Sequence, residues 1–558
     1  MKRISTGVED FKEIIDDNYY YIDKTMFIKD IVNEKFALYT RPRRFGKTLN
    51  MSMLYYFFSI NEKDNAYLFD DLEVSKDQEA MKHQNQYPVI YITLKDMKGT
   101  SYDEQIDSFS DIITDLYDQH HYIEDSNHVT RAMKNKFTKI YEGQGTKANL
   151  KNSLKILSTC LYQHFHKKVI ILIDEYDVPL SDAYSNGYFE VMSKFISGVF
   201  SAGLKTNKYI EKGAFTGCLR ISKESIFTGL NNFNVYSITE NRSSDRFGFT
   251  LNEVQNLCHY YSIDDKIDII KEWYDGYLFG NTEIYNTWSV LKYIDQVMQS
   301  IYEPISFWAN TSGNDIVKEY IEKSDSQLHD EFELLIQGEY IEKQISPELT
   351  YREMDRISNI YSFLLFTGYL KIHKIIDRSR NIYELEIPNK EIREIYINIF
   401  NEWFNDYTIA RKPLLMEALL HQDEKRAQSI IIQILNKTIS YHDEVEAFYH
   451  GFLGGLLVSD GYNIKSNDKY SIQSNKESGD GRFDLSVVPD DLNNPCIIIE
   501  CKISKERRKL KSDSQDAIDQ VIEKKYMDGF IADGYDPIYV YGLSFYKKTC
   551  FVTRLKSE

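Results

Sequence analysis

The segment Arg41–Thr48, with the sequence RPRRFGKT, constrains this chain more than any other stretch. It contains Gly46-Lys47-Thr48, the second half of a phosphate-binding loop. In such loops backbone amides surround phosphate groups, the lysine faces their charge, and the hydroxyl binds magnesium. Arg41 stands where that pattern normally has its first glycine.

The residues around this loop support the same interpretation. An apolar strand is predicted at 36–39 and an apolar, Met-rich helix at 49–58. A strand, a loop and a helix N-terminus together predict an anion site. Arg43 and Arg44 are candidates to supply charge that glycine amides would otherwise supply.

Composition limits the remaining possibilities. The 558 residues, 42% of them hydrophobic, predict several packed domains. The net charge of −18 argues against wholesale binding of a polyanion, so a nucleic-acid surface would have to be a local basic patch. Six scattered cysteines without a Cys-x-x-Cys pair indicate a reducing compartment and no zinc cluster. Because no apolar signal or membrane-spanning run is present, we expect a cytoplasmic protein.

A second motif, Val169–Asp177, has an apolar run that ends in acidic residues. A central parallel strand delivers such residues to the carboxyl edge of its sheet, and this is a Walker B pattern. Asp174 is expected to hold magnesium, and Glu175 to polarise the water that attacks the terminal phosphate. A buried strand with a solvated acidic turn is the alternative, but the loop at Gly46-Lys47-Thr48 favours a nucleotide site.

Further strands and helices predict the sheet that carries both motifs. A strand is expected at 87–94, helices at 102–161, and another strand at 213–217. Their alternation predicts the parallel α/β sheet of a P-loop NTPase. The segment 20–25 either contacts the nucleotide base or packs as an aromatic turn against the first strand.

Four polar residues after the sheet strands are candidates for sensing or completing the site. Thr216, near the end of the strand at 213–217, and Arg220, just after it, are expected to sense the terminal phosphate; the alternative is a turn with a surface arginine. Arg242 and Arg246 lie further along, and either could complete a site in cis or in trans.

The middle of the chain predicts a lid region. The aromatic, turn-rich segment 273–289 is expected to pack a lid against the ATPase core. Residues 300–345 are expected to be helical. A helix at 360–370 and a hairpin at 371–389 predict a winged-helix-like module, which in ATPases more often serves as a lid than as a DNA-binding element. A helical connector follows to about residue 436.

The C-terminal part carries a different pattern: Asp484 in a Gly-rich hairpin, then an apolar strand with Glu500-x-Lys502. Alternation along a strand places Glu500 and Lys502 on one face and Cys501 on the other. Asp484 and Glu500 would share a divalent ion, while Lys502 would orient the attacking water or stabilise the developing phosphate charge. This is the PD-(D/E)XK nuclease pattern.

Flanking residues fit the same pattern. Glu446 on an upstream helix and Gln520 on a downstream helix are possible accessory residues of the nuclease site. A basic run follows Lys502 directly and is expected to clamp a nucleic-acid backbone. It consists of Lys505, Arg507, Arg508, Lys509 and Lys511. For the helix residues and the basic run alike, a solvated surface is the alternative.

The whole chain resembles a prokaryotic family that joins an AAA-like P-loop ATPase domain to a C-terminal PD-(D/E)XK nuclease-like domain. The motifs that carry the resemblance are 21–25, 41–48, 173–177, 273–277, Asp484 and Glu500-x-Lys502. Members of that family also have the arginine-rich loop without its first glycine.

The fold class expected is α/β: a P-loop NTPase parallel sheet, a helical and winged-helix-like middle region, and a C-terminal restriction-endonuclease-like α/β domain. We place the ATPase core at 1–250, a helical lid at 251–345, the winged-helix-like module and connector at 346–435, and the nuclease-like domain at 436–558.

The expected function is ATP binding and hydrolysis that gates or positions magnesium-dependent cleavage of nucleic acid. DNA is favoured over RNA, manganese could replace magnesium, and a homo-oligomer stays open. One alternative is a nucleotide-dependent switch whose C-terminal domain binds a partner or nucleic acid without cleaving it. Another is a scaffold that binds ATP without turnover, against which Glu175 argues.

Overall fold

The computed structural model describes residues 1–205, 207–220, 233–308, 326–348, 357–409, 411–435, 453, 456–457, 470–474, 477–478, 481–482 and 484–556. The chain divides into two compact units. The first comprises Met1–Ser312 and Gly338–Ile395, and the second Gly313–Gln337 and Tyr396–Glu558. Within the described residues, no helix has the length and apolar character that crossing a membrane requires.

A five-stranded parallel sheet forms the centre of the first unit. Its order is β2-β3-β4-β1-β5. The strands are β1 (Phe36–Thr40), β2 (Val89–Thr93), β3 (Val169–Asp174), β4 (Ile210–Gly217) and β5 (Phe233–Tyr236). Every residue of β3 is buried, as expected for a strand covered on both faces. The predicted α/β class with a parallel sheet is confirmed.

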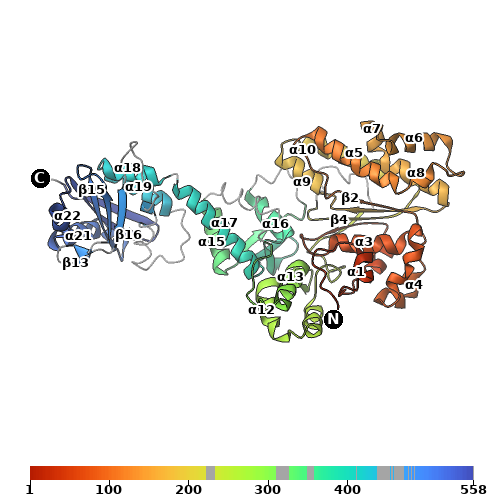
Figure 1. Cartoon of the computed structure of the whole chain (residues 1–558), viewed down its shortest axis with the longest axis horizontal. Coiled ribbons are helices and arrows are strands. Elements are labelled where there is room, and N and C mark those ends of the chain that lie inside the picture. The colour runs from red at the N-terminus through yellow and green to blue at the C-terminus, as the bar shows by residue number, and fades with distance from the viewer. Residues whose placement is uncertain are drawn as a thin grey trace. The chain divides into compact units, whose positions relative to one another are not determined.

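Helices cover both faces of this sheet. In Figure 1, α1, α3 and α4 lie on one side of it, and α5 to α10 on the other. Their bounds are α1 (Phe11–Asp16), α2 (Phe27–Val32), α3 (Lys47–Phe58), α4 (Gln78–Met81), α5 (Tyr102–Asp118), α6 (Arg131–Tyr141), α7 (Lys147–Lys151), α8 (Ser153–Phe165), α9 (Val178–Ser185) and α10 (Phe189–Leu204). Helix α3 begins directly after the loop that follows β1, so its N-terminus opens at the carboxyl edge of the sheet.

The segment after β5 forms a helical subdomain with its own apolar core. It contains α11 (Leu251–Tyr260), α12 (Ile267–Tyr274), the small hairpin β6 (Tyr277–Phe279) and β7 (Thr282–Ile284), and α13 (Thr287–Met298). Side chains of all three helices pack together in one hydrophobic cluster. Residues of the aromatic segment at 273–289 contribute to this cluster, and the role of the subdomain as a lid stays a prediction.

The rest of the first unit contains a helix followed by a hairpin. The elements are β8 (Ile341–Gln344), α16 (Ile357–Thr367), β9 (Lys371–Asp377) and β10 (Ile382–Glu386). The predicted helix and hairpin are present, and β8 adds a third strand in the order β8-β10-β9. The expectation of helix up to residue 345 is wrong at 341–344, because pairing with β10 makes this segment a strand.

The second unit is built on a mixed five-stranded sheet of order β11-β14-β15-β16-β17. Its strands are β11 (Tyr470–Ser474), β14 (Leu485–Pro489), β15 (Cys496–Ile503), β16 (Ile538–Tyr546) and β17 (Thr549–Arg554), with the separate pair β12 (Glu477–Ser478) and β13 (Gly481–Arg482). Only β15 and β16 pair in parallel among the described strands of this sheet.

Helices pack on both faces of the second sheet. They are α18 (Lys412–Leu420), α19 (Glu424–Leu435), α21 (Leu510–Glu523) and α22 (Tyr526–Ala532). One apolar cluster joins α18 and α19 to one face of the sheet, and another joins α21 and α22 to the opposite face. The remaining helices are α15 (Ser326–Gln337) and α17 (Lys390–Ile409), and α17 contains the boundary between the units.

A buried carboxylate connects several segments of the first unit that are distant in sequence. Glu391 is fully buried at the start of α17. It accepts hydrogen bonds from Ser289 Oγ at 2.8 Å and from the backbone N–H groups of Phe307 and Trp308 at 2.8 and 3.0 Å. Burial nevertheless raises the pKa of Glu391 to about 7, because it disfavours the charged form.

We expect this group to make the stability of the first unit depend on pH. The raised pKa means that the folded protein keeps a proton that the unfolded chain releases above about pH 4.3. The stabilisation is therefore complete below that value and is lost as the pH rises through about 7. The thermal unfolding midpoint of Glu391→Gln should change less between about pH 5.5 and about pH 8 than that of the parent protein.

The exposed Glu394 on the same helix is the matched control. Glu394→Gln should retain the pH dependence of the parent. An equal pH dependence in the parent and in Glu391→Gln would contradict the assignment.

Candidate nucleotide and nuclease sites

The nucleotide site is built around Asp174, which is buried at the carboxyl end of β3. Thr48 Oγ1 donates a hydrogen bond to one carboxylate oxygen at 2.7 Å, and Thr216 Oγ1 donates to the other. Burial raises the pKa of Asp174, and these two hydrogen bonds oppose that shift. The structure thus brings together three of the residues that the sequence singled out.

Strand β4 aligns the loops on either side of it. The backbone N–H of Arg41 donates to Gly217 O at 3.0 Å, and that of Tyr176 donates to Thr216 O at 3.1 Å. The chain leaving β1 and the chain leaving β3 are therefore attached to consecutive carbonyl groups. Glu175 lies between Asp174 and the second anchor with φ of 51°, a strained conformation for a side-chain-bearing residue.

The structure explains how Arg41 replaces a glycine. The left-handed positions of the loop are Arg44 and Gly46, with φ of 71° and 77°, and Arg41 is not one of them. Its fully buried guanidinium donates to the backbone oxygens of Thr40 and Tyr236, both at 2.8 Å, and of Ser243 at 3.1 Å.

Two aromatic rings complete the surroundings of Arg41. Its guanidinium carbon lies 5.1 Å from the ring centre of Phe247 and 5.2 Å from that of Phe279. Burial lowers the pKa of Arg41 to about 10, so the group stays charged near neutral pH. Arg41 thus anchors the loop to neighbouring backbone carbonyl groups and does not face the site.

Lys47 and Arg44 lie on the other side of the loop. Lys47 Nζ donates to the backbone oxygens of Arg41 at 3.2 Å and Pro42 at 2.9 Å. Burial alone would lower the pKa of Lys47. The surrounding acidic groups have the larger combined effect and raise this pKa. The guanidinium of Arg44 lies 4.2 Å from the ring centre of Trp288, and its carbonyl accepts from Thr287 Oγ1 at 2.7 Å.

A cavity of about 350 Å³ opens above this loop. Its lining includes the loop residues Arg43, Arg44, Gly46, Lys47 and Thr48 and the carboxylate of Glu175. Elsewhere its lining includes the apolar or aromatic side chains of Tyr20, Tyr21, Ile22, Phe249, Trp288 and Leu291. Four residues of the segment 20–25, which also include Lys24, thus form part of the cavity wall, and contact with a nucleotide base stays a prediction.

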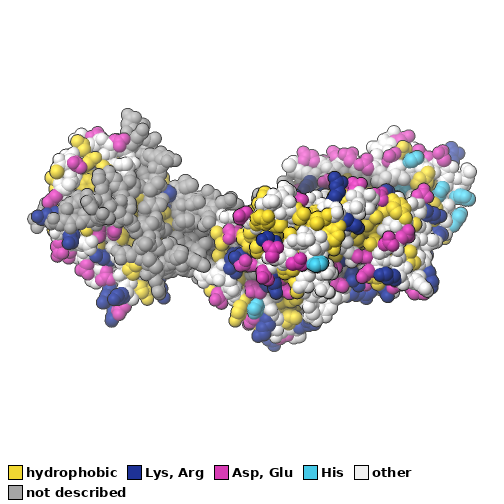
Figure 2. Space-filling view, turned by 60° about the horizontal axis from the view of Figure 1, so that its bottom comes forward, with side chains coloured by type: hydrophobic (Ala, Val, Ile, Leu, Met, Phe, Trp, Pro, Cys, Tyr) yellow, Lys and Arg dark blue, Asp and Glu magenta, His cyan; other side chains and the backbone are white. Residues whose placement is uncertain are grey.

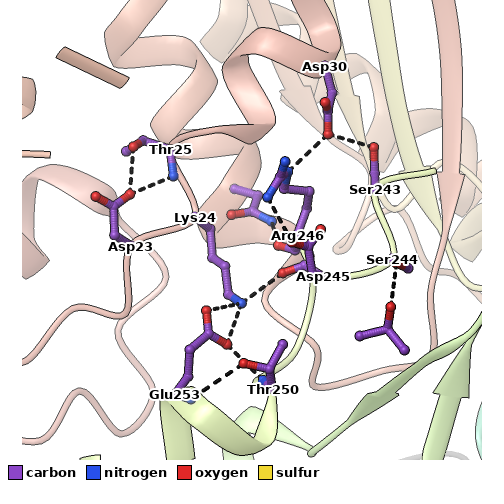
Figure 3. A network of polar contacts seen from close by, with 12 residues as sticks. Asp23, Lys24, Thr25, Asp30, Ser243, Ser244, Asp245, Arg246, Thr250 and Glu253 are labelled. Atoms are coloured by element: carbon purple, nitrogen blue, oxygen red, sulfur yellow. Dashed lines mark hydrogen bonds and ion pairs between the residues drawn. The ribbon is translucent and has the colours of Figure 1, made fainter. Parts of the chain in front are cut away.

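A polar network beside this wall fixes the loop that follows β5 (Figure 3). Lys24 Nζ donates to both carboxylate oxygens of Glu253 at 2.7 Å and to Asp245 O at 2.8 Å. Arg246 pairs with Asp30 at 3.1 Å and with Asp245 at 3.0 Å. Arg246 lines the cavity, but its guanidinium is engaged by these acids.

Two other predicted arginines point elsewhere. Arg220 pairs with Glu348 at 2.9 Å, and Arg242 pairs with Glu34 at 2.7 Å. Neither belongs to the cavity lining. The structure therefore does not bring Arg220 to the nucleotide site, although Thr216 is there.

The C-terminal candidate site lies beside the start of β14, which pairs in antiparallel fashion with β15. Asp484 directly precedes β14, and its Oδ2 accepts from the backbone N–H of Cys501 at 2.8 Å. Glu500 Oε2 in turn accepts from the backbone N–H of Asp484 at 3.3 Å. Leu485 pairs with Ile499 in the sheet, so the two carboxylates stand next to one another.

Helix α21 supplies the residue that connects this site. Gln520 donates from Nε2 to Glu500 and accepts at Oε1 from Lys502 Nζ. Glu500 and Lys502 therefore share one face of β15, as predicted, while Cys501 is buried in the opposite apolar core. Glu446 lies outside the described residues.

The basic run after Lys502 is exposed at all five of its positions, 505, 507, 508, 509 and 511. Arg508 forms an ion pair with Glu506. Over the face in Figure 2, acidic and basic side chains are interspersed.

Family comparisons match two parts of the chain. Residues 5–227 match a predicted AAA-ATPase family, and residues 444–555 match the PD-(D/E)XK nuclease superfamily. The chain joins an AAA-ATPase-like domain to a PD-(D/E)XK nuclease superfamily domain.

One curated protein and one solved structure show limited similarity to the chain. An uncharacterised protein in the vnfD 5' region of Azotobacter chroococcum mcd 1 is 24% identical over 303 residues, 52% of this chain and 51% of that protein. The chain thus spans about half the length of that relative. A solved structure, the Aeropyrum pernix ORC2 protein in ADPNP–ADP complexes, is 8% identical with a TM-score of 0.26, covering 70% of this chain and 98% of that one.

Both domains offer oxygen ligands of the kind magnesium prefers. In the AAA-ATPase-like domain these are the Thr48 hydroxyl and an Asp174 carboxylate oxygen, which are 2.7 Å apart. In the nuclease domain they are the neighbouring carboxylates of Asp484 and Glu500. Among the described residues, no group of three or more His, Cys, Asp or Glu side chains is placed to bind a metal ion. Both oxygen sets therefore fit magnesium only with water or phosphate oxygens as further ligands.

The sequence analysis assigned no role to Asp177. Asp177 is buried, and its Oδ2 accepts from the backbone N–H groups of Cys218 and Leu219, both at 2.9 Å. It thereby fixes the turn that follows β4, the strand that carries Thr216. The only signal in the sequence was its place three residues after Asp174.

We expect Arg41→Gly, which restores the usual glycine, to destabilise the AAA-ATPase-like domain by about 2–4 kcal/mol, since it leaves three buried carbonyl groups without donors and opens a cavity. Arg44→Gly is the matched control. Its φ of 71° suits glycine, and the lost stacking on Trp288 is worth about 1 kcal/mol, so little net change is expected. Denaturant unfolding of both variants measures the difference. Equal stability of Arg41→Gly and the parent would show that Arg41 is not an anchor.

Proposed function

We propose that the AAA-ATPase-like domain binds and hydrolyses ATP and that the PD-(D/E)XK domain cleaves phosphodiester bonds of nucleic acid. The observation that carries this proposal is common to both sites. In each, carboxylates on or next to a buried strand lie near a lysine: Asp174 and Glu175 with Lys47, and Asp484 and Glu500 with Lys502.

For ATP hydrolysis, the cavity supplies a place for each part of the nucleotide. The aromatic and apolar wall suits the base, and the loop amides with Lys47 suit the phosphates. Glu175 lines the cavity as a carboxylate that accepts a proton from the attacking water. Magnesium held by Thr48 and Asp174 would neutralise phosphate charge.

For nucleic-acid cleavage, Gln520 holds Lys502 and Glu500 in one geometry. Lys502 is placed to orient the attacking water or to stabilise charge on the phosphate. A divalent ion held by Asp484 and Glu500 would lower the pKa of bound water. The exposed basic run at 505–511 supplies a backbone contact, and DNA is the first substrate to test.

We further propose that nucleotide binding gates or positions the cleavage and that ATP and magnesium, or manganese in its place, are the cofactors. The presence of both domains in one chain supports this coupling. Homo-oligomerisation is compatible with it.

One purified protein, assayed with magnesium or manganese, tests both activities. Lys47→Ala should lower ATP hydrolysis by roughly 10²-fold or more, since it removes a buried cation at the phosphates. Lys502→Ala should abolish cleavage of single- or double-stranded DNA or RNA while ATP hydrolysis persists.

The exposed lysines Lys63 and Lys524 provide controls, since Lys63→Ala and Lys524→Ala should leave both activities unchanged. A parent protein that cleaves none of the four substrates would refute the nuclease proposal and favour a nucleotide-dependent switch. A parent that hydrolyses no ATP would refute the ATPase proposal.

A further inference from the structure

Hydrolysis of ATP by a P-loop enzyme usually requires an arginine that stabilises charge on the transferring phosphoryl group, supplied in cis or in trans. Three arginines that could serve are engaged by carboxylates: Arg220 by Glu348, Arg242 by Glu34, and Arg246 by Asp30 and Asp245. Arg44 is stacked on Trp288. Arg44 also lines the cavity with Glu175, but its guanidinium is taken up by this stacking.

Arg43 occupies a different position. It lines the cavity together with Lys47 and Glu175. The chain that carries Arg43 is anchored two residues earlier, where Arg41 N–H donates to Gly217 O at 3.0 Å. The chain that carries Glu175 is anchored one residue later, where Tyr176 N–H donates to Thr216 O at 3.1 Å. Arg43 and Glu175 thus flank the end of the same strand, β4, from its two sides.

The surroundings keep Arg43 charged. Burial works against its charge, but the facing groups of Cys218, Glu175 and Asp177 outweigh burial, and the pKa of Arg43 is raised. Asp177 is itself fixed by the backbone N–H groups of Cys218 and Leu219, so this environment is rigid. Arg43 and the proposed general base Glu175 line one cavity, so a charged guanidinium there can act in catalysis as well as in binding.

We propose that Arg43 is a catalytic arginine supplied in cis, which donates hydrogen bonds to the terminal phosphoryl group of ATP as water attacks it. This inference rests on the proposed ATP hydrolysis. The water oxygen forms a bond to the γ-phosphorus, and its proton passes to the Glu175 carboxylate. The bond from the γ-phosphorus to the bridging oxygen breaks, and its electron pair leaves with ADP. Negative charge moves during this step, so donors at Arg43 stabilise the transition state more than bound ATP.

A structural consequence follows. The nucleotide site is complete within one chain, and hydrolysis requires no arginine from a second copy. Arginine at position 43 then supplies in cis the charge that a neighbouring subunit supplies in other ATPases.

Steady-state kinetics of the full chain test the assignment. Arg43→Ala should lower kcat by about 10³-fold, with the Kd of a fluorescent ATP analogue changed by less than about threefold. Arg43→Lys should remain strongly impaired, because an ammonium group cannot present the planar fork. Arg380→Ala, at an exposed arginine on the hairpin of β9 and β10, is the matched control and should equal the parent.

Two further readouts separate catalysis from mere structural support. Guanidinium ion added to Arg43→Ala should restore part of kcat, which a folding defect would not allow. The parent with ADP and aluminium fluoride should form a stable complex that mimics the transition state, and Arg43→Ala should not.

A mixing experiment decides between cis and trans. If Arg43 acted on a neighbouring chain, Arg43→Ala mixed with Lys47→Ala would recover activity, because one combined site would be intact. We expect no recovery, and recovery would overturn the assignment in cis. A kcat for Arg43→Ala within about threefold of the parent, with Lys47→Ala still inactive, would overturn this inference alone. Absence of hydrolysis by the parent would overturn the proposed function as well.

Discussion

The carboxylate of Asp174 is the group on which the nucleotide site depends. It is buried at the end of a strand that is covered on both faces, where an ionised carboxylate is costly unless it has partners. The hydroxyls of Thr48 and Thr216 are those partners. Because they come from the helix after β1 and from β4, satisfying Asp174 also aligns the three strands that build the site.

Hydrogen bonds to buried polar groups also explain the unusual phosphate-binding loop. A glycine at position 41 would give freedom that this loop does not use, because its left-handed positions are 44 and 46. Arg41 instead reaches down to backbone oxygens of the segment after β5 and lies between two aromatic rings. These contacts fix the first residue of the loop. Arg43 and Arg44, later in the loop, line the cavity.

In the nuclease domain, a different set of elements holds the charged side chains in position. Here a side-chain amide, Gln520, bridges a carboxylate and a lysine that would otherwise attract each other directly. The bridge comes from a helix that packs on the neighbouring strands, so that helix packing determines the spacing of the acidic and basic groups. In both domains, polar groups at a strand end are positioned by elements distant in sequence.

Local sequence determined much of this protein. Apolar runs ending in acids, the Gly46-Lys47-Thr48 loop and the Glu500-x-Lys502 strand predicted the α/β class, both domain types and the main polar residues, because strand alternation and loop chemistry act over a few residues. The helix expected to residue 345 was wrong, since pairing with β10 overrode local preference. Only the tertiary structure decided that Arg41 is an anchor, that Arg220 lies outside the cavity, and that Asp177 and Trp288 belong to the site. The physical reason is distance along the chain: two of the acceptors of Arg41 lie 195 and 202 positions away, and no local pattern encodes such contacts.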